Sequence, residues 1–532
     1  MLAYWSTVSP FFSHGQRNRF SCKSDDLQTP TAVPQPKKRA VVIGSGWAGL
    51  GAAHHLCKQG LDVTVLEGGY ESELSRITSS PDEFGMRGFS YPYRNIFALV
   101  EELGIKPFTN WTTSAQYSAD GLLEVKFPVL QDLPQWPTPL GTLLYTQFAR
   151  LDLLDRLTSL PLMAAVVDFD NTDDAWRRYD SITARELFKQ FGCSEKLYSS
   201  VLDPLLQVGL FAPAEQCSAA ATLGMLYYFV LAHQKDFDFV WTRGTVKEKI
   251  FDPWIDNLKG KGCKFLNGRR VTDFGYNDET GSISEVVCGK ESLKADAVVL
   301  AVGIGMLQEI VKSSAVLSRR EEFLKVLNLS CTDLLTVKLQ LDKKVNIPNA
   351  SNACSGQDDD SYAWTFFDLN KIYDDYKEEE SSFIQADFFN ANELLPLKDE
   401  DIASKALSCL SKCIKGIDGA TIIDKEIGRF PRSLTRYFPG SYKYMMRGTT
   451  SFSNMFMAGD WIMSRHGSWL QEKSYVMGIE AANRVVDYLE EGNFAKIMPV
   501  EEDESHIQYL RSLSRSFSDL KLQLPWSDFF IQ

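Results

Sequence analysis

The sequence predicts an α/β protein that contains a nucleotide-binding unit of the Rossmann type. Residues 41–69, "VVIGSGWAGLGAAHHLCKQGLDVTVLEGG", read as a strand, a glycine turn, a helix, a second strand and an acidic end. The chain of 532 residues is also long for one compact core, so two or three domains or lobes are expected. No apolar run approaches the ~20 residues that a membrane-spanning helix needs.

The glycine turn has the spacing Gly44-x-Gly46-x-x-Gly49 directly after the first strand. In such a turn the first glycine allows the tight bend, the second lets the backbone approach a diphosphate, and the third lets the helix pack closely on the sheet. The free N–H groups and the positive dipole end of the helix then face the phosphates. The predicted cofactor-binding residues of this segment are Gly44, Ser45, Gly46, Ala48, Gly49 and Glu67.

Glu67 ends the second strand 23 residues after Gly44. A carboxylate at this position would accept hydrogen bonds from both hydroxyls of an adenosine ribose. It would repel the 2′-phosphate of NADP, so FAD and NAD remain as the candidate dinucleotides.

A second patterned segment lies near the end of the chain, at residues 454–489, "NMFMAGDWIMSRHGSWLQEKSYVMGIEAANRVVDYL". "MFMA" predicts a short buried strand that ends in Gly459-Asp460. A helix is expected to begin near Lys473, with Val476, Ile479 and Val486 on its inner face.

Together the two segments are similar to those of the flavin-containing amine oxidase and phytoene desaturase superfamily, including carotenoid isomerase-like relatives. The resemblance implies that the first unit binds the ADP part of FAD. It also implies that Gly459 and Asp460 reach the ribityl or diphosphate region. Met477, Gly478 and Ile479 would direct backbone N–H groups toward the flavin, and a helix start at this position would stabilise the reduced ring. The implied cofactor is a resident FAD.

Residues 239–303 support the same resemblance, because they predict a helix, a glycine turn at Gly262, a strand, a hairpin and the strand "ADAVVLAVG". In the family the valine that matches Val271 makes a backbone contact with the adenine. "AVGIGMLQ" (301–308) lacks a third glycine, which argues against a separate NAD(P) site. Residues 81–105 also match the family's segment beneath the flavin.

The implied architecture is a discontinuous Rossmann-like FAD-binding domain of the GR2 type with an inserted α+β substrate domain. The expected boundaries are a transit peptide and linker over 1–38, the FAD-binding domain over 39–106, 239–307 and 441–490, the substrate domain over 107–238 and 308–440, and an amphipathic tail over 491–532. One departure concerns a GG-R or GG-K loop that the family carries after the ribose acid. "YESELSRITSS" (70–80) stands there instead, so Arg76 or Arg87 would have to supply the positive charge.

The composition indicates the cellular compartment of the protein and excludes some classes of binding partner. The first 24 residues contain no Asp or Glu and several Ser and Thr, a composition typical of an organelle transit peptide, although a disordered N-terminus is the alternative. Serine outweighs arginine, which favours a plastid over a mitochondrion. The net charge of −13 argues against a nucleic-acid partner. The ten cysteines form no CxxC pair and the six histidines no cluster, so reduced thiols and no metal site are expected.

The predicted function is that of an FAD-dependent oxidoreductase that moves a hydride from a substrate carbon to the flavin, with oxygen or a quinone as the final acceptor. Desaturation or isomerisation of a lipophilic polyene or isoprenoid is favoured, because the middle of the chain is apolar. Amine oxidation stays open, since Trp461, Trp469 and Tyr475 could build an aromatic pocket. The third hypothesis is that the protein keeps the flavoprotein fold but acts as a scaffold or binding protein with little enzymatic turnover.

The sequence identifies no catalytic side chain. His466 and Lys473 lie near the implied flavin segment and are candidates, with a structural role as the alternative for each. The tail helix around 506–524 is amphipathic, so it either docks on the body of the protein or contacts a membrane surface. The oligomeric state is left open.

Overall fold

The structure is a computed structural model that describes residues 37–68, 87–356 and 363–523, with side chains up to Ser516 in the last helix. The predicted transit peptide, apart from its last residues, lies outside the described residues, and so do the 70–80 segment and Arg76.

One sheet of five strands forms the nucleotide-binding half. Its spatial order is β18 (Met455–Met457), β12 (Ala297–Leu300), β1 (Arg39–Ile43), β2 (Asp62–Glu67) and β8 (Lys264–Asn267), and every neighbouring pair is parallel. The central strands are continuous apolar runs because helices cover both faces of such a sheet. The sheet confirms the predicted α/β class, and its strands come from three separate parts of the chain.

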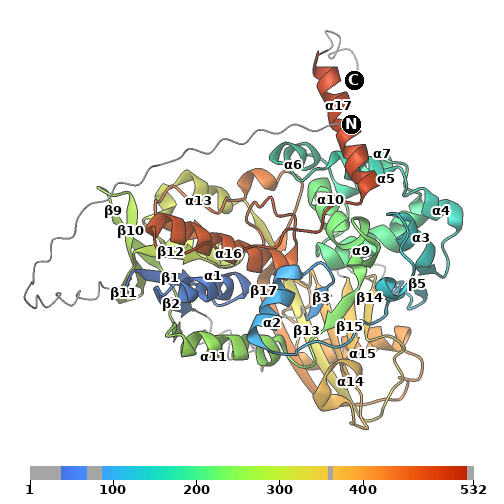
Figure 1. Cartoon of the computed structure of the whole chain (residues 1–532). Helices are drawn as coiled ribbons and strands as arrows, with labels where there is room; N and C mark the ends of the chain where they lie inside the picture. Colours follow the sequence, from blue (N-terminus) through green and yellow to red (C-terminus); the bar gives the residue numbers. More distant parts are fainter. Residues whose placement is uncertain (1–36, 69–86, 357–362, 524–532) are drawn as a thin grey trace, which may run out of the picture. The chain divides into compact units, whose positions relative to one another are not determined.

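Two helices from opposite ends of the sequence lie side by side on this sheet, α1 (Trp47–Lys58) and α16 (Leu470–Leu489) (Figure 1). Gly478 is the reason that they can approach so closely, because a Cβ at this position would lie 2.1 Å from the backbone oxygen of Ala48. Their neighbours are α2 (Arg94–Leu103) and α11 (Asp252–Gly260). A small antiparallel sheet of β9 (Asp273–Asn277), β10 (Ser282–Cys288) and β11 (Glu291–Lys294) follows β8, as the hairpin prediction requires.

The second large sheet has eight strands. Its spatial order is β17 (Ile422–Arg436), β13 (Ser330–Leu341), β16 (Phe383–Phe389), β15 (Trp364–Asp368), β14 (Ser351–Cys354), β4 (Ser114–Tyr117), β5 (Leu123–Phe127) and β6 (Gln147–Phe148). All neighbours are antiparallel except β14 and β4. One face of β13 packs Leu335, Val337 and Leu339 into the cluster that α15 (Asp399–Cys413) joins. The other face turns Leu334 toward Phe211 and Phe389.

A group of short helices follows over residues 140–226, and one of them packs against β14. The group comprises α3 (Leu140–Tyr145), α4 (Leu153–Leu157), α5 (Leu162–Asp168), α6 (Asp173–Tyr179), α7 (Ala184–Gln190), α8 (Glu195–Leu197), α9 (Asp203–Gly209) and α10 (Ala219–Leu226). The short strands β3 (Gly88–Ser90) and β7 (Phe239–Trp241) pair with each other. The remaining helices are α12 (Ile304–Ser313), α13 (Glu321–Val326), α14 (Leu369–Ile372) and α17 (Ser505–Gln523). The domain boundaries stated above stay predictions.

The tail helix α17 contacts α5 through its first turns. Ile507 is buried, and Arg511 donates hydrogen bonds from Nη1 to the backbone oxygens of Val167 (3.2 Å) and Phe169 (2.9 Å). Within residues 37–68, 87–356 and 363–523, no helix has the length and apolar character that crossing a bilayer requires.

Candidate functional site

The glycine turn has three glycines with different surroundings. Gly44 has a φ of +104°, and a Cβ there would lie 2.3 Å from the backbone oxygen of Ala301. A Cβ on Gly49 would lie 1.8 Å from the oxygen of Gly44, so both positions need glycine for the fold itself. A Cβ on Gly46 would meet nothing within 4 Å. The missing side chain of Gly46 therefore leaves open space rather than allowing internal packing.

Glu67 lies at the carboxyl end of β2, beside this turn. Its Oε2 accepts hydrogen bonds from the backbone N–H of Ser45 (3.2 Å) and from Ser45 Oγ (2.5 Å). The backbone N–H of Arg269 donates to the oxygen of Glu67 (2.9 Å), which brings the loop with the buried Val271 to the same edge of the sheet. The structure thus brings together the glycine turn, Glu67 and Val271, which are the three parts of the predicted adenosine site.

The late Gly-Asp pair follows β18. Gly459 has a φ of +147°, and Asp460 Oδ2 accepts a hydrogen bond from Thr435 Oγ1 (2.9 Å). Tyr437 donates from its hydroxyl to the backbone oxygen of Asp460 (3.1 Å). Burial raises the pKa of the Asp460 carboxyl, while the charge of Lys473 and the bond from Thr435 oppose the rise.

One cleft of about 310 Å³ joins the two ends of the sequence. It is lined by Gly46 and Trp47 from the opening turn, by Asp460, and by Leu470, Gln471 and Ser474 from the first turns of α16. Two predicted segments more than 400 residues apart therefore share one cleft. We call it the dinucleotide cleft.

The termini of two helices at this cleft suit a diphosphate. Gly46 is the N-cap of α1, whose first turn carries no acidic residue, and neither α1 nor α16 has a side-chain cap in the described structure. The first N–H groups of a helix have no intrahelical partner, and the helix dipole makes that end positive. Open space at Gly46 and these uncapped ends fit the anionic centre of a dinucleotide.

The start of α16 corrects one prediction. The helix begins at Leu470, not near Lys473, so Met477, Gly478 and Ile479 lie two turns inside it. Backbone N–H groups at such positions are bonded to carbonyls four residues earlier and are not free to reach a ring. Met477 is fully buried and Gly478 packs on α1. The free N–H groups belong instead to the first turn, whose Leu470 and Gln471 line the cleft.

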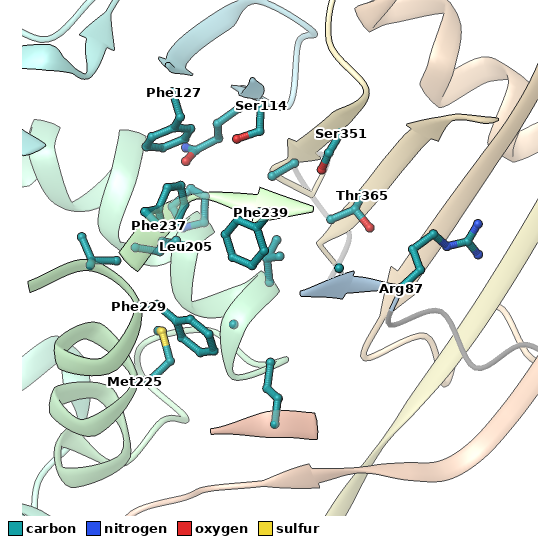
Figure 2. Close-up of a pocket in the computed structure, with 18 of the residues that line it drawn as sticks. Arg87, Ser114, Phe127, Leu205, Met225, Phe229, Phe237, Phe239, Ser351 and Thr365 are labelled. Carbon is teal, nitrogen blue, oxygen red and sulfur yellow. The ribbon is translucent and has the colours of Figure 1, made fainter. Parts of the chain in front are cut away.

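An apolar cavity of about 200 Å³ adjoins the dinucleotide cleft, and the two share Phe211, Leu470 and Gln471. Phenylalanines and aliphatic side chains dominate its walls (Figure 2). A further chamber of about 110 Å³ shares Phe127, Phe237 and Leu205 with this cavity. The apolar space therefore extends away from the cleft in two neighbouring sections.

Two of the three residues shared by cleft and cavity have a left-handed backbone. Phe211 has a φ of +61° and Leu470 a φ of +51°, values that cost a non-glycine residue energy. Gln471, the third, accepts a hydrogen bond on Oε1 from the Tyr93 hydroxyl (2.9 Å). Such strain gathers at functional sites, where the surrounding packing holds it in place. Nothing in the sequence signals a positive φ at a phenylalanine or a leucine, and these residues were not predicted.

Arg87 does not fill the predicted role at the diphosphate. It is buried against the apolar cavity, donates from Nη1 to the Tyr373 hydroxyl (2.8 Å), and lies over the rings of Phe367 and Tyr373. Among the described residues, the cation that lines the dinucleotide cleft is Lys247, whose Nζ also contacts Asp252 Oδ2 at 3.0 Å. It follows β7 in a region where the sequence carried no phosphate motif.

The three aromatic residues proposed for an amine pocket lie elsewhere. Trp461 is fully buried and donates from Nε1 to the backbone oxygen of Val302 (3.2 Å). Trp469 stacks on Trp176, and Tyr475 packs edge-on against Trp254. None of the three lines the cleft or the cavity, so the prediction that they build a pocket is wrong.

The two candidate catalytic side chains have partners inside the fold. His466 contacts Ser468 Oγ through Nδ1 (2.8 Å) and the backbone oxygen of Met498 through Nε2 (2.7 Å), and burial lowers its pKa. Lys473 is 7% exposed and lies over the ring of Trp469. Burial lowers its pKa to about 8, and the Asp460 carboxylate opposes that shift. Both surroundings suit a structural role.

Comparison with known proteins agrees with the geometry of the site. Residues 47–486 match the family model described as flavin containing amine oxidoreductase. The chain is 24% identical to the zeta-carotene desaturase, chloroplastic/chromoplastic, of Zea mays, over 83% of this chain and 84% of that protein. It is 22% identical to the zeta-carotene desaturase of a Synechocystis strain, over 83% and 97%. It is 21% identical to the 15-cis-phytoene desaturase of Synechococcus elongatus, over 80% and 92%.

Solved structures share the fold at low sequence identity. Cyclohexylamine oxidase from Brevibacterium oxydans has a TM-score of 0.63 at 16% identity, over 86% of this chain and all of that chain. Putrescine oxidase bound to putrescine has a TM-score of 0.62 at 14% identity, over 85% and 100%. At such identity the likeness concerns the fold.

Proposed function

We propose that this chain, an FAD-dependent oxidoreductase that belongs to the flavin-containing amine oxidoreductase family, acts on a long apolar polyene or isoprenoid. The observation that carries the proposal is the apolar cavity that meets the dinucleotide cleft at Phe211, Leu470 and Gln471. A substrate carbon must come next to the flavin, and a hydrocarbon chain needs apolar walls along its length. The carotenoid desaturases among the relatives act, by their names, on such molecules.

The residues that would hold FAD are those at the cleft. The backbone at Gly46 and the uncapped start of α1 would face the diphosphate. Glu67 would exchange its bonds from Ser45 for the ribose hydroxyls, with Val271 beside the adenine. Asp460 would accept a hydrogen bond from the ribityl chain, and the first N–H groups of α16 would face the ring. When bound, FAD accepts a hydride from a substrate carbon and passes the electrons to oxygen or a quinone.

The chain's own contribution to the reaction is to position the substrate. Phe211 and Leu470 close the boundary between cleft and cavity, and their backbone conformation fixes where their side chains lie. An apolar boundary also keeps water away from the reacting carbon. Desaturation takes a hydride from one carbon and a proton from its neighbour, whereas isomerisation removes neither in the net reaction, and both need the reacting carbons to be held in this place.

The test uses protein that lacks residues 1–38 and has been loaded with FAD. We expect a flavin absorbance band that bleaches without oxygen when a C40 polyene in detergent is added, with about ten times less bleaching by an alkylamine of similar length. Bleaching by the amine alone would contradict the proposal and favour amine oxidation. A folded, colourless protein that takes up no FAD would favour the scaffold reading.

We also propose that this substrate is reached from a lipid surface, through residues 122–157. Eight of the 17 large apolar side chains that are exposed in the described structure lie in this segment, among them Trp136, Leu144 and Leu154. Helix α3 carries Leu140 and Leu144 on its exposed face, while its Thr142 and Leu143 line the second apolar chamber. An exposed apolar group of this size suits a membrane interface, and an insoluble substrate could pass directly into the chamber.

Flotation with liposomes tests this contact. Leu153→Ser with Leu154→Ser should lower the binding constant for liposomes by about 30-fold, because about 2 kcal/mol of apolar burial is lost. Leu324→Ser, which changes an exposed leucine on α13, is the matched control and should float like the unaltered protein. Equal flotation of both variants would contradict the assignment of the surface. If flotation were lost only when α17 is removed, the membrane contact would be assigned to the tail helix instead of residues 122–157.

A plastid location is the last part of the proposal. The acid-free start of the chain supports it, and several plant relatives are named as chloroplastic/chromoplastic. Residues 1–38 fused to a fluorescent protein should direct it to plastids; a mitochondrial or diffuse signal would contradict this.

A further inference from the structure

One wall of the apolar cavity carries a row of hydroxyl groups. The wall is formed by strands β4, β14 and β15 of the eight-stranded sheet. Ser351 lies directly opposite Ser114 in the register of β14 and β4, and Ala353 lies opposite Thr365 in that of β14 and β15. Ser114, Ser351 and Thr365 all line the cavity, and Figure 2 shows them on neighbouring strands on one side of it.

Thr365 is the residue whose environment points to a ligand. It is 6% exposed, and its Oγ1 is buried with no hydrogen-bond partner among the residues that the structure describes. Buried hydroxyls in folded proteins nearly always have a partner, because an unpartnered polar atom loses its bonds to water without compensation. The partner that is missing within the chain can be supplied by the molecule that fills the cavity.

The walls facing this row are apolar. Phe229, Phe237 and Phe239 lie across from it with Leu205 and Met225, and Phe127 lies beside Ser114 on the same sheet (Figure 2). A pure hydrocarbon would satisfy these walls but would leave the Thr365 hydroxyl unpartnered. A molecule with one oxygen function on an apolar body would satisfy both.

We propose that Ser114, Ser351 and Thr365 form a subsite for a neutral oxygen function, a hydroxyl or a carbonyl, on the apolar substrate. This rests on the proposed function and narrows its substrate class to oxygenated polyenes or isoprenoids. Hydroxyl side chains both donate and accept, so they suit either group. A carboxylate suits the row less well, because the cation that lines the cavity in the described structure, Arg87, donates to the Tyr373 hydroxyl and lies over two aromatic rings.

The test compares two ligands on the FAD-loaded full chain. The ligands are a polyene alcohol and its deoxy hydrocarbon of equal length, and their affinities are measured by quenching of tryptophan fluorescence. The alcohol should bind about tenfold more tightly to the unaltered protein, as one or two hydrogen bonds allow. Thr365→Val keeps the shape of the side chain and removes the hydroxyl, so the affinity ratio should fall to about twofold or less. Adding Ser351→Ala should bring it to one.

Thr332→Val is the matched control. Thr332 also has a buried Oγ1 without a partner in the described structure, but it lies on β13 and does not line the cavity. This variant should keep the tenfold ratio. The subsite would be overturned if the alcohol and the hydrocarbon bound the unaltered protein equally well, or if Thr365→Val kept the same affinity ratio. In either case, tight binding of the hydrocarbon would still support the proposed function. Preference for the matching carboxylic acid would overturn its neutral character. Binding of neither polyene would overturn both proposals.

Discussion

Replacing Gly46 by alanine separates the stability of the fold from its affinity for FAD. A Cβ at this position meets nothing within 4 Å in the protein, and the backbone φ of −78° is ordinary for alanine. The free energy of unfolding of the FAD-free variant should therefore change by less than about 1 kcal/mol. The new methyl group instead occupies the space through which a diphosphate would approach the start of α1.

The expected loss follows from the hydrogen bonds that the methyl group would prevent. Two charge-assisted bonds from backbone N–H groups to the phosphates are worth about 3 kcal/mol together, which corresponds to a Kd for FAD about 100 times higher. At an FAD concentration of about 100 times the original Kd, bound FAD stabilises the unaltered protein by about 2.7 kcal/mol. The variant should gain only about 0.4 kcal/mol at the same concentration.

Urea unfolding with and without FAD measures both quantities. Gly260→Ala is the control, because Gly260 at the end of α11 also has nothing within 4 Å and lies away from the cleft. Its stability and its gain from FAD should match those of the unaltered protein to within about 1 kcal/mol. If Gly46→Ala were stabilised by FAD as strongly as the control, phosphates would not lie over this turn. If the FAD-free variant unfolded, the space at Gly46 would not be open.

Two further substitutions test the packing around the cleft. Gly478→Ala places a methyl group 2.1 Å from the Ala48 oxygen, so α1 and α16 must separate and the FAD-free protein should lose about 1–3 kcal/mol in urea unfolding; unchanged stability would contradict the close helix contact. Glu472 is fully buried and accepts hydrogen bonds from the backbone N–H groups of Asn95 (2.8 Å) and Ile96 (3.0 Å), and burial raises its pKa from 4.5 to about 7. Because the folded state favours the protonated acid, stability should fall as pH rises from 4.5 to 7, by at most about 3 kcal/mol; Glu472→Gln should remove this slope, and an equal slope in the variant would refute the assignment.

The sequence was sufficient for the local fold of the candidate site. Gly44, Gly49 and Glu67 belong to one strand–turn–helix–strand unit, whose geometry follows from the spacing of the glycines. Asp460 was assigned through the family resemblance of its segment, and it follows a buried strand of the parallel sheet, whose strands bring their carboxyl ends to one edge. Short-range patterns of this kind survive because few other parts of the fold can alter them.

The parts that failed depend on contacts between distant segments. Helix α16 begins at Leu470, after the extended residue Trp469, and it has no side-chain cap. The sequence therefore contains no N-cap residue from which this start could be predicted. Arg87 was a candidate for binding phosphate because the sequence does not show its aromatic partners. These partners, Phe367 and Tyr373, lie almost 300 residues further along the chain. Lys247 reaches the cleft from the turn that opens α11, where a lysine is usually a surface residue. The sequence shows none of these pairings.

The boundary between cleft and cavity suggests how one fold can serve different substrates. The FAD-binding half offers backbone groups at an open turn and at uncapped helix ends, together with a few carboxylate side chains. The substrate half meets it at Phe211 and Leu470, whose left-handed backbones each cost about 1–3 kcal/mol. A natural protein retains a strained backbone conformation when the resulting side-chain position contributes to function and the loss of stability is tolerated. The strained backbones of Phe211 and Leu470 therefore hold this boundary in place, and substrate choice is left to the walls of the cavity beyond it.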